Sequence, residues 1–152
     1  MNPPAVYTIN IDGAARGNPG PAAFAYVISA DGTPTIEESG CLGHATNNVA
    51  EYTALGRALR WLRDRQTGPV TSLTVRGDSQ LVVKQMTGEW TCRKPHLARL
   101  RDRCRELAGE IGVEPRYDWV PREENAEADA LAREAYTRAT GKPFPEHPER
   151  RR

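Results

Sequence analysis

The sequence has few cysteines and no long apolar stretch. Its three cysteines, Cys41, Cys92 and Cys104, are far apart and form no Cys-x-x-Cys or Cys/His pair, which argues against a disulfide framework and a zinc site. They are expected to be ordinary buried or half-buried thiols. The longest apolar run, residues 22–28, has seven residues and no basic leader precedes it, so neither a membrane span nor a signal peptide is expected. We therefore expect a cytoplasmic protein.

The chain contains enough apolar side chains for a single core. Its 152 residues, 38% of them hydrophobic, fit one globular domain, which we place at residues 1–140. From residue 141 onward, prolines, glycine and a terminal arginine triplet predict a flexible tail, residues 141–152. The net charge of +1 hides a basic strip between Arg93 and Arg105, where Asp102 is the one acid. Such a strip is consistent with nucleic-acid binding and equally with a solvated helix face.

Hydrophobic periodicity predicts an α/β fold. Residues 5–12 alternate between apolar and polar side chains, which predicts a strand that ends at Asp12. The turn formers of residues 13–21 lead into a second strand over residues 22–29. Asp31-Gly32 then turns the chain into a third strand over residues 35–42. Further strands are expected over residues 72–76 and 117–120. Helices are expected after Thr46 up to residue 68, from residue 80 to about 88, after Pro95 to about 111, and over residues 125–140.

Four acids lie at the ends of these predicted elements. Asp12 closes a strand, Glu51 lies in the first turn of a helix, Asp78 follows a strand and Asp129 comes early in the last helix. Bringing them together costs repulsion, which a divalent cation offsets, because Mg²⁺ and Mn²⁺ prefer hard oxygen ligands. Singly, each acid also has an ordinary interpretation as a helix-dipole partner or, for Asp78, an N-cap.

The strings around these acids carry a resemblance to a known family. They are residues 11–28 (IDGAARGNPGPAAFAYVI), 46–59 (TNNVAEYTALGRAL), 75–90 (VRGDSQLVVKQMTGEW) and 119–132 (WVPREENAEADALA). Over roughly residues 5–137 the sequence resembles the type 1 ribonuclease H family. The resemblance implies a five-stranded mixed sheet, with three antiparallel and then two parallel strands, flanked by about four helices. It also implies an endonuclease that hydrolyses the RNA strand of RNA/DNA hybrids and leaves 5′-phosphate and 3′-hydroxyl ends.

The resemblance further implies a role for each acid. Two Mg²⁺ or Mn²⁺ ions are expected, with Asp12 bridging both. Asp129 is expected to complete the shell of the ion that activates water, and Glu51 and Asp78 to hold the ion at the leaving oxygen.

Substrate contacts follow from the same resemblance. Discrimination of RNA from DNA needs groups that sense the 2′-hydroxyl. The positions expected to bind the hybrid are Gly13, Ala14, Ala15, Asn18, Thr46, Asn47, Asn48, Gln80, Arg122 and Asn125. Asn18 and Thr46 match positions that grip a DNA phosphate, whereas Asn48 and Gln80 match those near the 2′-hydroxyl. Helix capping is the alternative for Asn47 and Asn48.

Two family features are missing from this sequence. The loop before the last helix reads PREENAEA and lacks the catalytic histidine of larger members; Arg122 is the nearest substitute, but a guanidinium stays charged at neutral pH. The basic protrusion is also missing, because only about residues 87–95 separate the two middle helices. The basic strip and Trp90 are then expected to supply hybrid affinity, unless Trp90 anchors the helix.

Other functions stay open at this point. The chain is consistent with a non-catalytic or differently specific nucleic-acid-binding member of the ribonuclease H-like superfamily, because fold does not fix function. It is also consistent with one domain of a longer protein. A monomer that does not bind membranes is expected.

Overall fold

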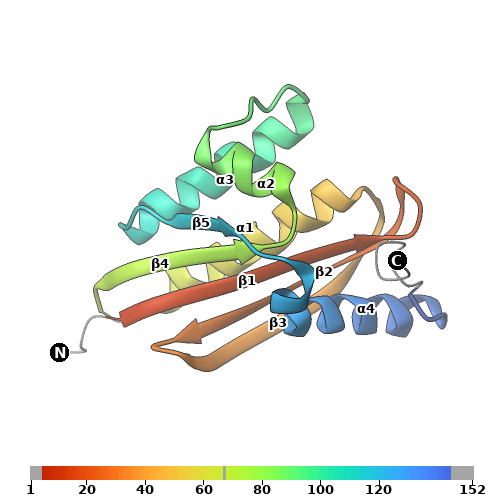
Figure 1. The fold of residues 1–152 in the computed structure, drawn as a ribbon, viewed down its shortest axis with the longest axis horizontal. Helices are drawn as coiled ribbons and strands as arrows, with labels where there is room; N and C mark the ends of the chain where they lie inside the picture. The colour runs from red at the N-terminus through yellow and green to blue at the C-terminus, as the bar shows by residue number, and fades with distance from the viewer. Residues whose placement is uncertain (1–4, 67, 145–152) are drawn as a thin grey trace.

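The described residues form one five-stranded mixed sheet (Figure 1). The computed structural model describes residues 5–66 and 68–144. The strands are β1 (Ala5–Ala15), β2 (Gly20–Ala30), β3 (Thr33–Ala45), β4 (Val70–Gly77) and β5 (Arg116–Trp119). They lie in the order β3-β2-β1-β4-β5, with β1, β2 and β3 antiparallel and β4 parallel to both β1 and β5. The predicted architecture is confirmed.

The first hairpin is longer than predicted. β1 continues to Ala15 and Asp12 pairs with Ala25 of β2, so the prediction that Asp12 ends a strand is wrong. The chain reverses only over residues 16–19, because pairing with β2 keeps Gly13 and its successors extended despite their turn-forming composition. The second turn, at Asp31-Gly32, is confirmed, and both of its residues have positive φ, 50° and 82°.

Four α-helices lie within the described part of the chain. They are α1 (Asn47–Arg65), α2 (Gln80–Thr87), α3 (Pro95–Ile111) and α4 (Ala126–Thr140), and a short 3-10 helix η1 (Arg122–Asn125) precedes α4. Thr46 caps α1 by accepting a hydrogen bond from the Val49 N–H at 3.2 Å. Gly88 ends α2 with φ of 87°, a conformation that favours glycine.

Helices cover both faces of the sheet, as Figure 1 shows. On one face α1 packs on β1 and β2, and α3 packs on α1. This side holds the main core, in which Ile9, Leu55, Leu59 and Val75 have no exposed surface. On the other face α4 packs over alanines, including Ala25 of β2. Small side chains there allow the helix to lie close to the strands.

The structure also tests the predictions for the cysteines and for the tail. Among the cysteines, Cys92 and Cys104 are buried as expected, but Cys41 is exposed because β3 is an edge strand. Of the predicted tail, residues 141–144 are described, and Phe144 packs against Tyr136 of α4. The remainder of that tail lies outside the described residues, and the boundary at residue 140 stays a prediction. None of the helices in the described ranges is both long and apolar enough to cross a membrane.

Candidate active site

Asp12 lies in the middle of the sheet where two strands approach a common end. Its neighbour Ile11 pairs with Gly77, the last residue of the parallel strand β4. Asp12 is therefore beside Asp78, which follows β4 directly. Only 5% of the Asp12 surface is exposed, so its carboxylate is largely removed from water.

Glu51 reaches Asp12 from α1. Because α1 begins at Asn47, Glu51 lies in the second turn, and the prediction that it occupies the first turn is wrong. Its Oε1 accepts a hydrogen bond from the Gly13 N–H at 3.0 Å, and Asp12 Oδ1 accepts from the same N–H at 2.9 Å. A Cβ at Gly13 would lie 2.6 Å from the Glu51 nitrogen and 2.7 Å from the Ala50 Cβ. Glycine is thus required for α1 to bring Glu51 against β1.

Asp78 joins them from the turn between β4 and α2. Ser79 is the N-cap of α2, since its Oγ accepts from the Val82 N–H at 3.3 Å, and the capping interpretation of Asp78 is therefore wrong. The indole N–H of Trp119 donates to the Asp78 carbonyl at 3.1 Å, which ties β5 to this turn. Arg122 approaches the carboxylate, with 3.5 Å between its Nε and Asp78 Oδ2.

Asp12, Glu51 and Asp78 form an acidic triad. One carboxylate oxygen from each lies within 4.8 Å of the others. Burial raises the pKa of both Asp12 and Glu51 well above the usual range, and neighbouring carboxylates raise them further, Asp78 for Asp12 and Asp12 for Glu51. Glu51 Oε2 is buried and accepts no hydrogen bond from the described residues. A purely carboxylate donor set with a spare buried oxygen fits a hard divalent cation.

Asp129 lies near this triad without being part of it. It is in the first turn of α4, as predicted, and 6% of its surface is exposed. The oxygens within 4.8 Å of one another do not include those of Asp129, but its charge contributes to the raised pKa of Asp12. The Arg133 Nε lies 3.5 Å from Asp129 Oδ1. The four predicted acids therefore gather as three plus one.

The predicted substrate residues divide into two groups. Asn47, Asn48 and Arg122 line a cavity of about 260 Å³ together with the triad, and Gln80 is exposed at the start of α2. In contrast, Asn18 and Thr46 direct their side-chain oxygens at the start of α1. Asn18 Oδ1 accepts from the Asn47 N–H at 3.0 Å. Both oxygens are thus engaged with the helix start in this structure.

Asn125 does not fit its predicted role. It has no exposed surface, and its Nδ2 donates to the Ile11 carbonyl at 2.7 Å. The prediction that it binds substrate is therefore wrong, because a fully buried side chain cannot touch a nucleic acid. Asn125 instead fixes the start of α4 against β1, next to Asp12.

Sequence reasoning missed two residues at this site, Trp119 and Arg133. A tryptophan closing a short strand directly before the predicted loop was visible, but its bond to the Asp78 carbonyl depends on strand pairing. Arg133 follows Asp129 by four residues, which is the spacing of an ion pair on a helix. That spacing was a usable signal.

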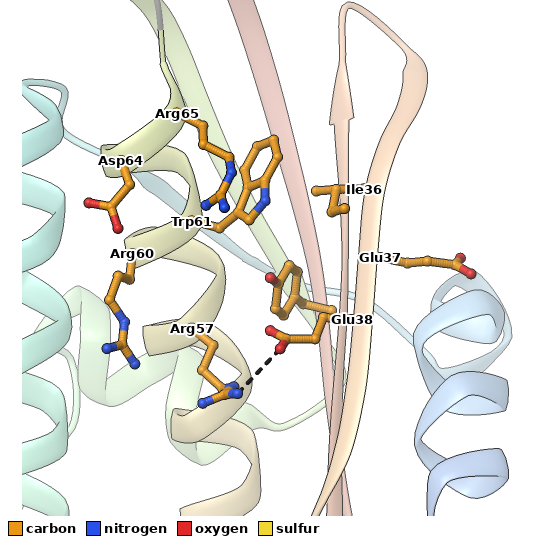
Figure 2. A pocket seen from close by; sticks show the side chains of 9 residues that line it. Ile36, Glu37, Glu38, Arg57, Arg60, Trp61, Asp64 and Arg65 are labelled. Atoms are coloured by element: carbon orange, nitrogen blue, oxygen red, sulfur yellow. Dashed lines mark hydrogen bonds and ion pairs between the residues drawn. The ribbon is translucent and has the colours of Figure 1, made fainter.

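A larger cavity lies elsewhere. It has a volume of about 550 Å³ and is bounded by α1, β2 and β3. Figure 2 shows Arg57 and Glu38 paired across it, with 3.2 Å between Nη2 and Oε2, and Trp61 and Arg65 beside each other on α1. None of the triad carboxylates lines it, so we do not assign the catalytic chemistry to this cavity.

Comparison with known proteins decides the family. A family profile described as "Reverse transcriptase-like" matches residues 10–135. The ribonuclease H of Pelobacter propionicus is 34% identical over 151 residues, which cover 89% of this chain and 87% of that protein. This chain belongs to the type 1 ribonuclease H family. The ribonuclease HI of Halobacterium salinarum is 49% identical over 129 residues, 82% of this chain, and the chain spans 61% of that protein's length.

Solved structures of type 1 ribonucleases H have the same fold. The crystal structure of LC11-RNase H1 in complex with an RNA/DNA hybrid matches 88% of this chain and 98% of that chain, with a TM-score of 0.82 and 38% sequence identity. Within this ribonuclease H family the chain is compact. α2 ends at Thr87 and α3 begins at Pro95, so the basic protrusion is missing between them, as predicted.

Proposed function

We propose that this ribonuclease H family member hydrolyses the RNA strand of RNA/DNA hybrids in a reaction that depends on divalent cations. The observation that carries the proposal is the acidic triad, whose oxygens lie within 4.8 Å of one another although β1, α1 and the end of β4 are distant in sequence. Burying three like charges together is unfavourable unless a cation compensates them. The hybrid bound to LC11-RNase H1 supports the substrate class.

Two ions, Mg²⁺ or Mn²⁺, complete this proposal. Asp12, Glu51 and Asp78 would hold them, with Asp129 contributing from α4. When bound, such ions supply Lewis acidity for an in-line displacement at phosphorus that yields 5′-phosphate and 3′-hydroxyl ends. The Gly13 N–H orients two of the ligands, because it donates to both Asp12 and Glu51. The centre is therefore oriented before the substrate arrives.

The residues around the triad are proposed to select the RNA strand. Asn48 lines the triad cavity and Gln80 is exposed beside it, so both side-chain amides are available to a 2′-hydroxyl. Arg122, in the same cavity, would bind a phosphate oxygen as a permanently charged donor. It cannot transfer protons as the missing histidine would. We therefore expect slow turnover.

Affinity for the DNA strand is proposed to come from the basic strip on α3 and the turn before it. Trp90 is 43% exposed, so part of its surface is open to a sugar-phosphate backbone, and Lys84 Nζ lies over the ring, 5.7 Å from its centroid. Arg93 and Lys94 are exposed beside it. A cytoplasmic location and a monomeric state stay predictions.

The proposal is tested by the products of cleavage. A hybrid labelled on the RNA strand would be incubated beside RNA/RNA, DNA/DNA and single strands, with Mg²⁺, with Mn²⁺ and with chelator. We expect cutting of the RNA strand of the hybrid alone, abolished by chelator. The Asp118→Asn variant, which changes an acid on β5 paired with Arg116 at 2.9 Å, is the matched control and should cut normally. Cutting of duplex DNA or RNA instead would establish a differently specific family member, and no cutting at all a non-catalytic one.

A further inference from the structure

Arg133 connects the acid outside the triad to the chain that follows α4. Its Nε lies 3.5 Å from Asp129 Oδ1, one helical turn away, and its side chain is 24% exposed. On the other side, the guanidinium carbon lies 5.8 Å from the centroid of the Phe144 ring. The charged group is thus held between a carboxylate and an aromatic ring.

Phe144 is itself held firmly. After α4, Gly141 has φ of 73° and the chain turns back along the helix (Figure 1). The Phe144 ring meets Tyr136 edge-on, with centroids 4.9 Å apart and planes at 89°, and Tyr136 is buried. Phe144 also packs against the alanine cluster between α4 and the sheet. The Phe144 ring is therefore held in place beside Arg133 by its packing on α4 and the sheet.

The Arg133 guanidinium has buried nitrogens without hydrogen-bond acceptors in the described part of the chain. Its Nε and Nη2 are buried and make no hydrogen bond within the described residues. Burying two N–H donors without acceptors is costly, so the nearby Asp129 carboxylate compensates the charge of this half-buried guanidinium. Asp129 in turn is the one predicted ligand that the triad does not include.

We propose that Arg133, held by Phe144, is a positioning residue that competes with a divalent cation for Asp129. Its charge partly neutralises that carboxylate and repels a cation approaching the same oxygens, so it weakens the ion site that Asp129 would complete. The inference rests on the proposed function only in treating Asp129 as an ion ligand. It adds a residue on α4 that sets how readily that site fills.

The test is Mn²⁺ affinity measured without substrate. Calorimetry on chelator-stripped protein would compare the wild type with Arg133→Gln. The matched control is Arg138→Gln, because Arg138 forms the same kind of pair on the same helix, 3.0 Å from Glu134, but both side chains are 65% exposed. We expect Arg133→Gln to bind at least one Mn²⁺ roughly threefold or more tightly, the scale of a partly exposed charge pair, and Arg138→Gln to match the wild type.

A second variant covers the case in which Arg133→Gln does not fold. Phe144→Leu keeps the arginine but removes the ring beside it, so the guanidinium can move away, and tighter Mn²⁺ binding is again expected. Unchanged or weaker binding in the folded variants would overturn the inference. If the wild type cleaves hybrids and binds Mn²⁺ but the variants bind no more tightly, this inference alone fails. If the wild type binds no Mn²⁺, the proposed function fails with it.

Discussion

The four acids, three in the triad and one outside it, differ in their charge environment, and on that ground we divide them into an inner and an outer pair. Asp12 and Glu51, the inner pair, share the Gly13 N–H, and no Lys, Arg or His within the described ranges forms an ion pair with them. Asp78 and Asp129, the outer pair, each lie 3.5 Å from an arginine nitrogen. The inner pair therefore carries uncompensated repulsion, whereas the outer pair is already partly neutralised.

This difference indicates that the two pairs contribute differently to ion binding. The inner carboxylates are buried on β1 and α1, where their raised pKa reflects a site that favours either protons or a cation. The outer carboxylates begin α4 or follow β4, where arginines compete for their charge. Ion binding should depend most strongly on the inner pair and be adjusted by the outer pair.

The largest expected effect compares one acid from each pair. Asp12→Asn should reduce hybrid cleavage about 1,000-fold or more, because it removes a triad ligand at the centre of the charge cluster. Asp129→Asn should cost only about 10- to 100-fold, since Asp129 lies outside the triad. Single-turnover cleavage at saturating Mg²⁺ measures both. Equal losses for the two variants would remove the distinction between the pairs.

The second-largest effect is expected at Asn125, whose buried side-chain amide lies next to the inner pair. Asn125→Ala removes a fully buried amide and its hydrogen bond to the Ile11 carbonyl, so we expect the free energy of unfolding to fall by about 2 kcal/mol. Cleavage should also fall about tenfold as Asp12 and Asp129 lose their common support. Urea denaturation measures the stability, with Glu123→Ala, an exposed neighbour in η1, as control. An unchanged midpoint would mean that the amide bond contributes nothing net.

The pH dependence of the ion-free protein should expose the repulsion directly. Because the folded-state pKa of Asp12 and Glu51 is raised, the folded state binds protons more tightly than the unfolded chain, and stability falls as pH rises from about 4 through the raised pKa. Asp12→Asn should therefore be about 1 kcal/mol more stable than the wild type above that range, with the difference vanishing near pH 4.

Asp129→Asn sharpens this measurement. It should gain less stability than Asp12→Asn, because it also removes the partner of Arg133. Denaturation in chelator between pH 4 and 8 provides the comparison. A wild type that is the most stable protein at neutral pH would show that the inner pair is not under repulsion.

The smallest expected effect concerns the support of Asp78. Trp119→Phe keeps an aromatic ring but removes the indole N–H that donates to the Asp78 carbonyl. We expect kcat to fall roughly threefold, the scale of one partly exposed hydrogen bond, with KM unchanged. A rise in KM at constant kcat would instead mean that the exposed indole contacts the substrate.

Local sequence signals predicted the architecture well. The Asp31-Gly32 turn, the Thr46 cap and the Gly88 stop depend on residues close in sequence, and the structure has each of them. Alternation of side chains located the strands for the same reason. The four acids were chosen because the strings around them resemble the type 1 ribonuclease H family, not because of their local boundaries alone.

Features that depend on distant partners could not be predicted in this way. Asp12 appeared to end a strand because glycine and proline follow it, yet pairing with Ala25 carries β1 onward. Glu51 shifted to the second turn because α1 starts at Asn47. Asn125 is buried only when α4 lies on the sheet. The packing of Phe144 beside Arg133 depends on the same arrangement.

The bond from Asn125 to Ile11 spans 114 positions of the chain. During synthesis, the segment carrying Asp12, Glu51 and Asp78 leaves the ribosome well before Asn125 and Asp129 do. A nascent chain can therefore hold most of its acidic ligands while the strand that bears Asp12 still lacks its final anchor. The acidic site is therefore completed only after α4 has been synthesised, and truncations that stop before η1 should yield chains that do not cleave hybrids.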